Sequence, residues 1–149
     1  MAPKEIRDSG RAVIASLTLP GHERSAAHIR RFVRDTLGAD HPAVDDVNTC
    51  VNEAFTNGVT HTASGRGGRI TVTLAAAPGE LFAEVTDDGA NGARPHLRSP
   101  GVESGRGMHL IDALTGGWGL HADGDRTTIW MRFPSAWSGA RGFCRPPGP

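Results

Sequence analysis

Three polar residues at intervals of four are the first feature of this sequence that could do chemistry. Glu53, Asn57 and His61 would share one stripe of a helix, because a step of four residues rotates an α-helix only about 40° past a full turn. The stripe flanks the apolar face expected for the same segment, so these side chains would be partly buried, where an unpaired carboxylate or amide is costly. A bound ligand or metal ion would supply their partners. A solvated flank with ordinary hydrogen bonds is the alternative.

Two further segments have the chemistry of a binding site. The first is VTDDG at residues 85–89, where a predicted strand ends in a carboxylate and a glycine. Asp87 could accept a hydrogen bond there from an exocyclic amine such as that of adenine, although Asp and Gly are also common turn residues. The second is GRG at residues 105–107, which leads directly into a predicted helix. Free amides at a helix N-terminus bind phosphate groups, and a flexible start of the helix is the alternative.

The composition of the 149 residues excludes several classes of protein. Sixteen basic and sixteen acidic residues give a formal net charge of zero, which removes the electrostatic argument for nucleic acid or an anionic membrane as partner. Lys4 is the only lysine and lies outside any glycine-rich loop, so neither a P-loop nor a protein-kinase ATP site is present. No two of the seven histidines have the spacing of a helical metal site.

The expected location is the cytoplasm. Cys50 and Cys144 have no paired-motif spacing, as expected in a reducing compartment. No apolar run reaches the length of a membrane span, and the first twenty residues lack the order of a signal peptide.

The elements that must position the polar residues follow from periodicity and turn signals. They are a strand at 11–19, helices at 22–37 and 43–62, a hairpin at 70–86, a loop at 90–104 that we expect to close as a lid, a helix at 107–114 and a hairpin at 118–133. This order predicts an α+β two-layer sandwich, with a mostly antiparallel sheet and helices on one face. We expect a flexible N-terminus at 1–10, one domain at 11–133 and a disordered Pro/Gly-rich tail at 134–149.

The joint order and spacing of these segments resemble the GHKL, or histidine kinase-like, ATPase superfamily, and most closely its small anti-sigma-factor serine kinases. The stretch NEAFTNGVTH at 52–61 is similar to their N-box. VTDDG at 85–89 looks like the first glycine box and GRGMHLI at 105–111 like the second. The likeness covers roughly residues 11–133 and implies the histidine kinase-like ATPase fold.

By that resemblance, the expected cofactors are ATP and Mg²⁺. Glu53 would orient or deprotonate the attacking hydroxyl, and Asn57 would coordinate Mg²⁺ through its side-chain oxygen. Asp87 would bind the adenine amine, and Gly89 would leave room for the base. The residues that the resemblance assigns to ATP binding are Asn57, His61, Asp87, Gly89, Gly105, Arg106, Gly107, Met108, His109 and Thr128.

The activity that the resemblance implies is that of an ATP- and Mg²⁺-dependent serine/threonine protein kinase that is also an anti-sigma factor and regulates transcription. Its partners would be a small anti-sigma antagonist and a sigma factor, and the family often forms homodimers through its sheet. Two alternatives stay open: a catalytically inactive, nucleotide-dependent protein-binding module, and a domain that binds no nucleotide. The chain departs from the family pattern at Ala90, Asn91 and Arg126 in the glycine boxes, and at Gly58, where alanine is usual.

Overall fold

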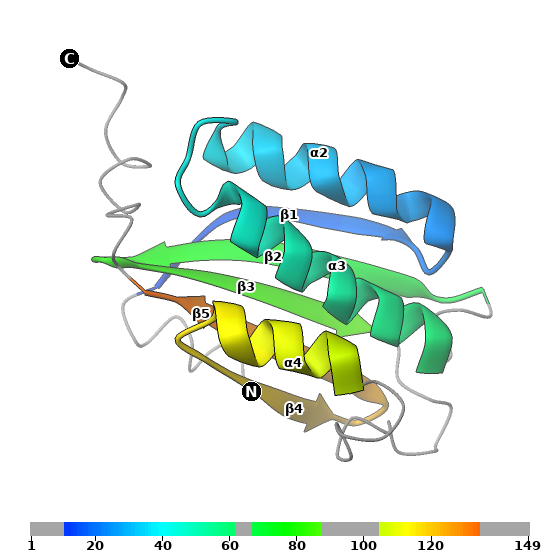
Figure 1. The fold of residues 1–149 in the computed structure, drawn as a ribbon. Coiled ribbons are helices and arrows are strands. Elements are labelled where there is room, and N and C mark those ends of the chain that lie inside the picture. The colour runs from blue at the N-terminus through cyan, green and yellow to red at the C-terminus, as the bar shows by residue number, and fades with distance from the viewer. Residues whose placement is uncertain (1–10, 62–66, 88–104, 135–149) are drawn as a thin grey trace.

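The computed structural model describes residues 11–61, 67–87 and 105–134. These residues form two layers, with a sheet behind and helices in front (Figure 1). In chain order the elements are β1 (Ala12–Pro20), η1 (Glu23–Ser25), α2 (Ala26–Leu37), α3 (Val44–His61), β2 (Arg69–Ala77), β3 (Glu80–Asp87), α4 (Gly105–Leu114), β4 (Gly117–Asp123) and β5 (Arg126–Phe133).

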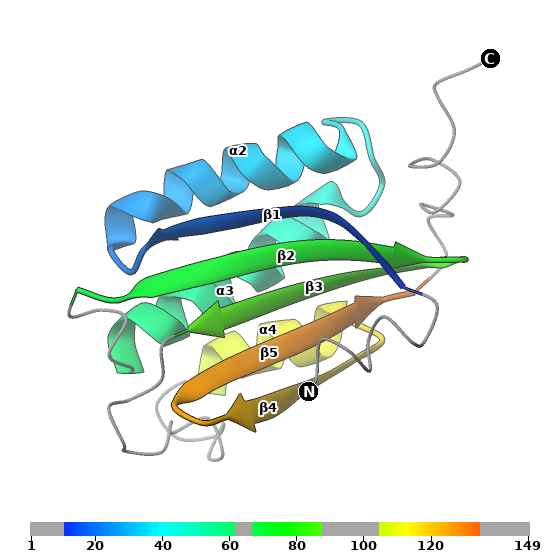
Figure 2. The ribbon, with the colours of Figure 1, turned by 180° about the vertical axis from the view of Figure 1, so that it is seen from behind.

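The described strands form one sheet in the order β1-β2-β3-β5-β4, and every neighbouring pair is antiparallel. Side chains alternate between its faces, as the period of two requires. On β2, Ile70, Val72 and Leu74 are buried toward the helices, whereas Thr71 and Thr73 face outward and meet hydroxyl groups of β1. Seen from behind, none of the described helices lies on the outer face (Figure 2). The predicted α+β sandwich is confirmed.

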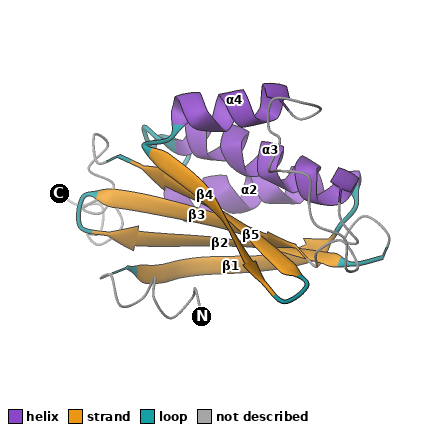
Figure 3. Cartoon of the chain, turned by 90° about the horizontal axis from the view of Figure 1, so that it is seen from below, coloured by secondary structure: helices purple, strands orange, loops and turns teal. Residues whose placement is uncertain are grey.

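The helices that the structure describes all lie on the inner face of the sheet (Figure 3). The central helix is α3, which packs against α2 on one side, α4 on the other and β3 beneath. Its inward stripe is buried as the spacing predicts. The stripe consists of Val44, Val47, Val51, Ala54, Phe55 and Gly58.

The ends of several elements differ from the sequence prediction. The helix expected from His22 begins with the short 3₁₀ turn η1, because the His22 imidazole Nδ1 accepts the Arg24 backbone N–H at 3.0 Å. It ends at Leu37 as predicted, and Gly38, which follows, has a φ of 102° as a glycine stop allows. The last helix begins two residues earlier than predicted, at Gly105.

Some expectations fall on parts of the chain that the structure does not describe. These are the flexible N-terminus at 1–10, the lid at 90–104 and the tail at 134–149 apart from Pro134. Among the described helices, none is long and apolar enough to cross a membrane.

Candidate functional site

Three elements that carry the predicted site residues end or begin at the same end of the molecule. The C-terminal end of α3, the C-terminal end of β3 and the first turn of α4 lie together there (Figure 1). The antiparallel register and the packing of α3 between its neighbours produce this arrangement. The sequence segments 52–61, 85–87 and 105–111 are therefore neighbours in space.

Asp87 provides the carboxylate of this site. It is the last residue of β3 and follows Leu81, Ala83 and Val85 on the inner face, so the strand's alternation carries it under the helices. Its side chain is only 3% exposed. A carboxylate loses much of its hydration there, so hydrogen bonds to it are strengthened and its position is well defined. This environment suits an acceptor that recognises one donor group of a ligand.

The helix α3 reaches Asp87 at Gly58. A Cβ atom built on Gly58 would lie 3.5 Å from both Cβ and Oδ2 of Asp87, which is ordinary van der Waals contact. The residue before it, Asn57, is 7% exposed, and Glu53 lies half-buried one turn earlier. The structure thus brings the buried amide and the buried carboxylate to the same part of the inner face, although they are 30 positions apart in the sequence.

The flank of α3 that carries Glu53 also carries Asp46 and Cys50. The Cys50 side chain is fully buried. Burial is the main cause that raises the pKa of its thiol to about 12, and the nearby carboxylates of Asp46 and Glu53 contribute to this shift in the same direction. The raised pKa of the Cys50 thiol indicates that the charges of both carboxylates act on this flank of α3. A negative flank close to the buried Asn57 favours the approach of a cation.

The two threonines of β5 lie on opposite faces of the sheet. Thr127 is the cross-strand partner of Asp87 and is 4% exposed on the inner face. Thr128 pairs with Thr86, and the two hydroxyl oxygens are 2.7 Å apart. The sequence prediction named Thr128, which the structure does not bring to Asp87. Strand alternation with the buried Ile129 could have pointed to Thr127 instead.

For the remaining predicted site residues, the structure gives mainly their positions along the elements. Gly105, Arg106, Gly107 and Met108 form the first turn of α4, whose N–H groups have no acceptor within the helix and can bind anions. His109 follows them and is exposed.

The other two assigned residues lie at or beyond the ends of described elements. His61 is the last residue of α3. Gly89 is outside the described residues.

The described residues fit Mg²⁺ bound together with a phosphate ligand better than a cage built by the protein alone. No group of three or more His, Cys, Asp or Glu among them could hold a metal ion. Mg²⁺ prefers oxygen ligands, keeps several waters and uses few protein ligands when a nucleotide supplies phosphate oxygens. The side-chain oxygen of Asn57 is a suitable donor of this kind.

Comparison with known proteins gives a consistent result. The sequence profile described as "Histidine kinase-like ATPase domain" matches residues 19–133. A solved structure of the RsbU and RsbW domains of Rv1364c from Mycobacterium tuberculosis is similar in fold, with a TM-score of 0.55 and 22% sequence identity. The match covers 80% of this chain and 32% of that one, so the present chain spans about a third of its length. No curated protein matches the sequence.

The profile match begins at the end of β1 and runs through β5, so it includes α3, β3, α4 and the residues of the site. The chain belongs to the family of histidine kinase-like ATPase domains.

Proposed function

We propose that this chain is an ATP-binding regulatory protein: an anti-sigma factor with Mg²⁺-dependent serine/threonine kinase activity toward a small antagonist protein. The observation that carries the proposal is the close approach of α3, at Gly58, to the buried Asp87, directly beside the buried Asn57. Membership of the family supports ATP as the ligand. The RsbW domain named for the similar structure supports the regulatory role.

The residues of the site have distinct tasks in this proposal. The Asp87 carboxylate accepts a hydrogen bond from the exocyclic amine of adenine. The amides in the first turn of α4 receive the phosphates at the same end of the molecule. Asn57 would hold Mg²⁺, which neutralises charge on the phosphate oxygens when it is bound.

Phosphoryl transfer in this site requires positioning and one proton acceptor. The hydroxyl oxygen of the partner's serine or threonine forms a bond to the γ-phosphorus while the bond from that phosphorus to the bridging oxygen breaks, and ADP leaves. The carboxylate of Glu53, one helical turn before Asn57, accepts the hydroxyl proton. The product gains a charge of about −2, which would weaken its docking to an apolar or acidic surface.

Replacing Glu53 distinguishes a kinase from an inactive binding module. We expect Glu53→Gln to lower the rate of phosphate transfer by about 10²- to 10⁴-fold, because the proton acceptor is lost. Affinity for ATP should stay within about twofold, since Glu53 does not contact the base or phosphates in this proposal. The assay incubates the protein with γ-labelled ATP, Mg²⁺ and antagonist-type proteins captured on the immobilised chain.

Asp45→Asn is the matched control, because Asp45 is an exposed acid in the first turn of the same helix. It should leave transfer unchanged. If the wild-type protein binds ATP but labels no captured protein, the kinase is excluded and the nucleotide-dependent binding module remains.

A further inference from the structure

We propose that the open edge of β4 pairs with the same edge of a second copy of this chain, so that the two five-stranded sheets join into one. β4 is the last strand in the sheet order, and among the described strands only β5 pairs with it. Alternate residues of such an edge strand direct their N–H and C=O groups away from the sheet. The inference does not depend on nucleotide binding.

The two edges of the sheet differ in how well they are protected against an added strand. Natural edge strands are commonly protected by lysine, proline, a bulge or an inward-pointing charge. The β1 edge has a shift of register between Val13 and Ala15 and ends at Pro20. β4 pairs regularly with β5 along its whole length, and its sequence GWGLHAD has neither lysine nor proline and a single acid, Asp123, at its end. The β4 edge is therefore the better template for pairing.

The inner-face residues of β4 fit an antiparallel copy of the same strand. Only one antiparallel register pairs all seven residues, and it places Leu120 opposite Leu120 of the second copy. The same register places Trp118 opposite Ala122, and both of these residues pair with buried inner-face residues of β5. The Leu120 side chain is 38% exposed in the single chain. Apolar side chains thus meet apolar side chains along this face, and the pairing removes Leu120 from water.

The outer face of β4 leaves room for the side chains of the second copy. In this register Gly119 lies opposite His121, and a glycine offers no side chain that could clash with the imidazole. The Trp130 indole covers Gly119, because a Cβ atom built on that glycine would lie 2.7 Å from the indole Nε1. The imidazole of the second copy therefore reaches the edge of an aromatic ring, which is a favourable neighbour.

The two ends of β4 carry complementary charges. Asp123 is exposed and lies opposite Gly117 of the second copy, on the outer face. The Arg132 guanidinium lies over Gly117, because a Cβ atom built there would be 3.2 Å from its Nη2. The carboxylate of one copy thus meets the guanidinium of the other, and the two-fold symmetry repeats this contact at both ends. Exposed ion pairs add little affinity, so this contact mainly selects the register.

The proposed dimer has a defined geometry. Its two-fold axis passes through Leu120 at right angles to the sheet, so the helices of both copies lie on one face. Asp123 pairs with Arg126 at the same end of the sheet as Asp87, and the antiparallel arrangement places the two Asp87 ends far apart. The outer face of the joined sheet stays uncovered. This distinguishes edge pairing from a dimer in which two sheets pack face to face.

Sedimentation velocity of the whole chain tests the proposal with two charge variants. Leu120→Asp places two carboxylates directly opposite each other at the two-fold axis, where like charges are destabilising. Val13→Asp is the matched control, because Val13 is 53% exposed on the other edge strand, β1. We expect the wild type to dimerise with a Kd in the micromolar range, and Leu120→Asp to raise this Kd at least about tenfold. Val13→Asp should keep it within about twofold.

A cross-link locates the interface independently. In a Cys144→Ser background the remaining Cys50 thiol is buried. Leu120→Cys in this background should be joined into a covalent dimer by a short bismaleimide, because directly opposite residues of antiparallel strands have Cβ atoms about 4.5–5.5 Å apart. Val13→Cys should stay monomeric under the same conditions. Thermal unfolding by circular dichroism shows that each variant is folded.

Several results would overturn the proposal while leaving the proposed function in place. A monomeric wild-type protein is one, and the β4 edge would then be open to a strand of another protein. A dimer that Leu120→Asp does not weaken is another. Cross-linking through Val13→Cys instead of Leu120→Cys would assign the interface to β1 or to the outer face. If Leu120→Asp does not fold, the cross-link of Leu120→Cys decides alone.

Discussion

At the scale of single residues, Cys50 reports on the environment of the flank that carries Glu53. The thiol is fully buried in the folded protein, and its pKa is raised from 9.0 to about 12. Desolvation is the main cause, and the charges of Asp46 and Glu53 act in the same direction. The folded state therefore holds the thiol proton more tightly than the unfolded chain does.

This difference predicts a loss of stability at alkaline pH. Below pH 9 the thiol is protonated in both states and its contribution is fully present; between about pH 9 and 12 only the unfolded chain releases the proton, so unfolding becomes more favourable. We expect the wild-type protein to lose about 1.4 kcal/mol more than Cys50→Ala between pH 8 and pH 10. Urea unfolding of both proteins at the two pH values measures it. Equal losses of unfolding free energy in the two proteins would show that the Cys50 thiol ionises as readily in the folded state as in the unfolded chain.

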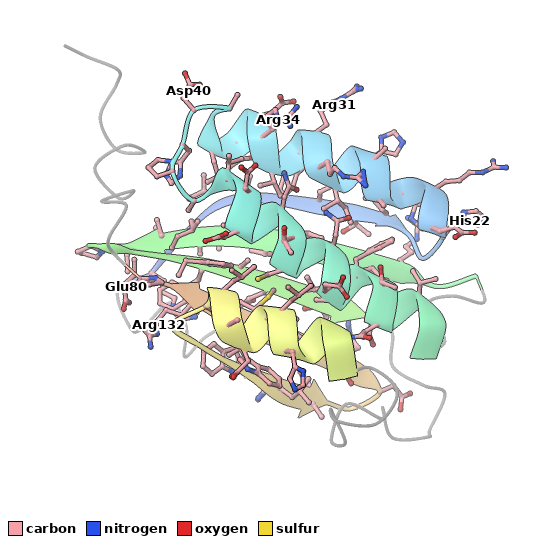
Figure 4. All side chains as sticks on the ribbon, viewed as in Figure 1. His22, Arg31, Arg34, Asp40, Glu80 and Arg132 are labelled. Carbon is pink, nitrogen blue, oxygen red and sulfur yellow. The ribbon has the colours of Figure 1, made fainter. Side chains whose placement is uncertain are left out.

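At the scale of elements, Arg132 joins the end of α4 to the sheet. Its Nη2 donates to the Gly116 carbonyl at 2.6 Å, and the Gly116 N–H donates to the Arg132 carbonyl at 2.7 Å. Its Nη1 lies 3.3 Å from Oε2 of Glu80, and both side chains are at the end of the sheet opposite Asp87 (Figure 4). A Cβ on Gly116 would be 3.1 Å from that Nη1, so the guanidinium lies directly against the glycine.

Removing this link should loosen the connection between α4 and β4. We expect Arg132→Ala to lower the free energy of unfolding by about 1–2 kcal/mol, mainly through the lost bond to the Gly116 carbonyl, because a half-exposed ion pair such as the one with Glu80 contributes little. Arg132→Lys should have an intermediate effect. Arg126→Ala, at an exposed position of the same strand, is the control. If the two alanine variants have the same free energy of unfolding, the hydrogen bond from Arg132 to the Gly116 carbonyl does not stabilise the fold.

Most elements could be predicted because their signals are local. The alternation along β2 and β3, the Pro78-Gly79 turn between them and the apolar stripe of α3 are each visible within a few residues. The start of α4 at Gly105 was placed two residues too late, since a Gly-Arg-Gly sequence has weak intrinsic helix propensity and tertiary packing extends the helix.

The site was only partly predictable, for physical reasons. Glu53, Asn57 and Asp87 could be proposed from the joint order of the motifs and the family resemblance, and their roles remain predictions. The close approach of Gly58 to Asp87 and Ile70 could not be predicted, because it brings a helix against two strands and has no local sequence pattern. The choice between Thr127 and Thr128 depends on the register of β5 with β3, which decides which of the two faces the helices. The period of two along a strand gives this answer only once a buried residue on the same strand is known.

At the scale of the whole molecule, the two faces of the sheet have different tasks. The inner face carries the core and the proposed site, while the outer face carries hydroxyl groups and a stacked arginine. The Arg11 guanidinium lies 3.5 Å from the ring centroid of Phe82 and 3.9 Å from the Glu84 carboxylate. This stacking helps to explain why Phe82 is only 3% exposed on a face that none of the described helices covers. On the opposite side, Arg31 and Arg34 of α2 point away from the sheet (Figure 4).

The central claim concerns the whole molecule, since the proposed nucleotide site needs α3, β3 and α4 at one end of the fold. It predicts that Asp87→Asn weakens ATP binding selectively, because a neutral amide of the same shape is a poorer acceptor for the adenine amine and leaves the packing with α3 in place. The size of the loss should be about 10- to 100-fold, with a melting temperature close to that of the wild type.

Calorimetric titration of ATP into the wild-type protein and Asp87→Asn, each with and without Mg²⁺, tests this claim most directly. We predict saturable binding to the wild type with a Kd in the micromolar range, weaker binding without Mg²⁺, and the stated loss in the variant. Absence of saturable binding to the wild-type protein, or equal affinity of the two folded proteins for ATP, would contradict it.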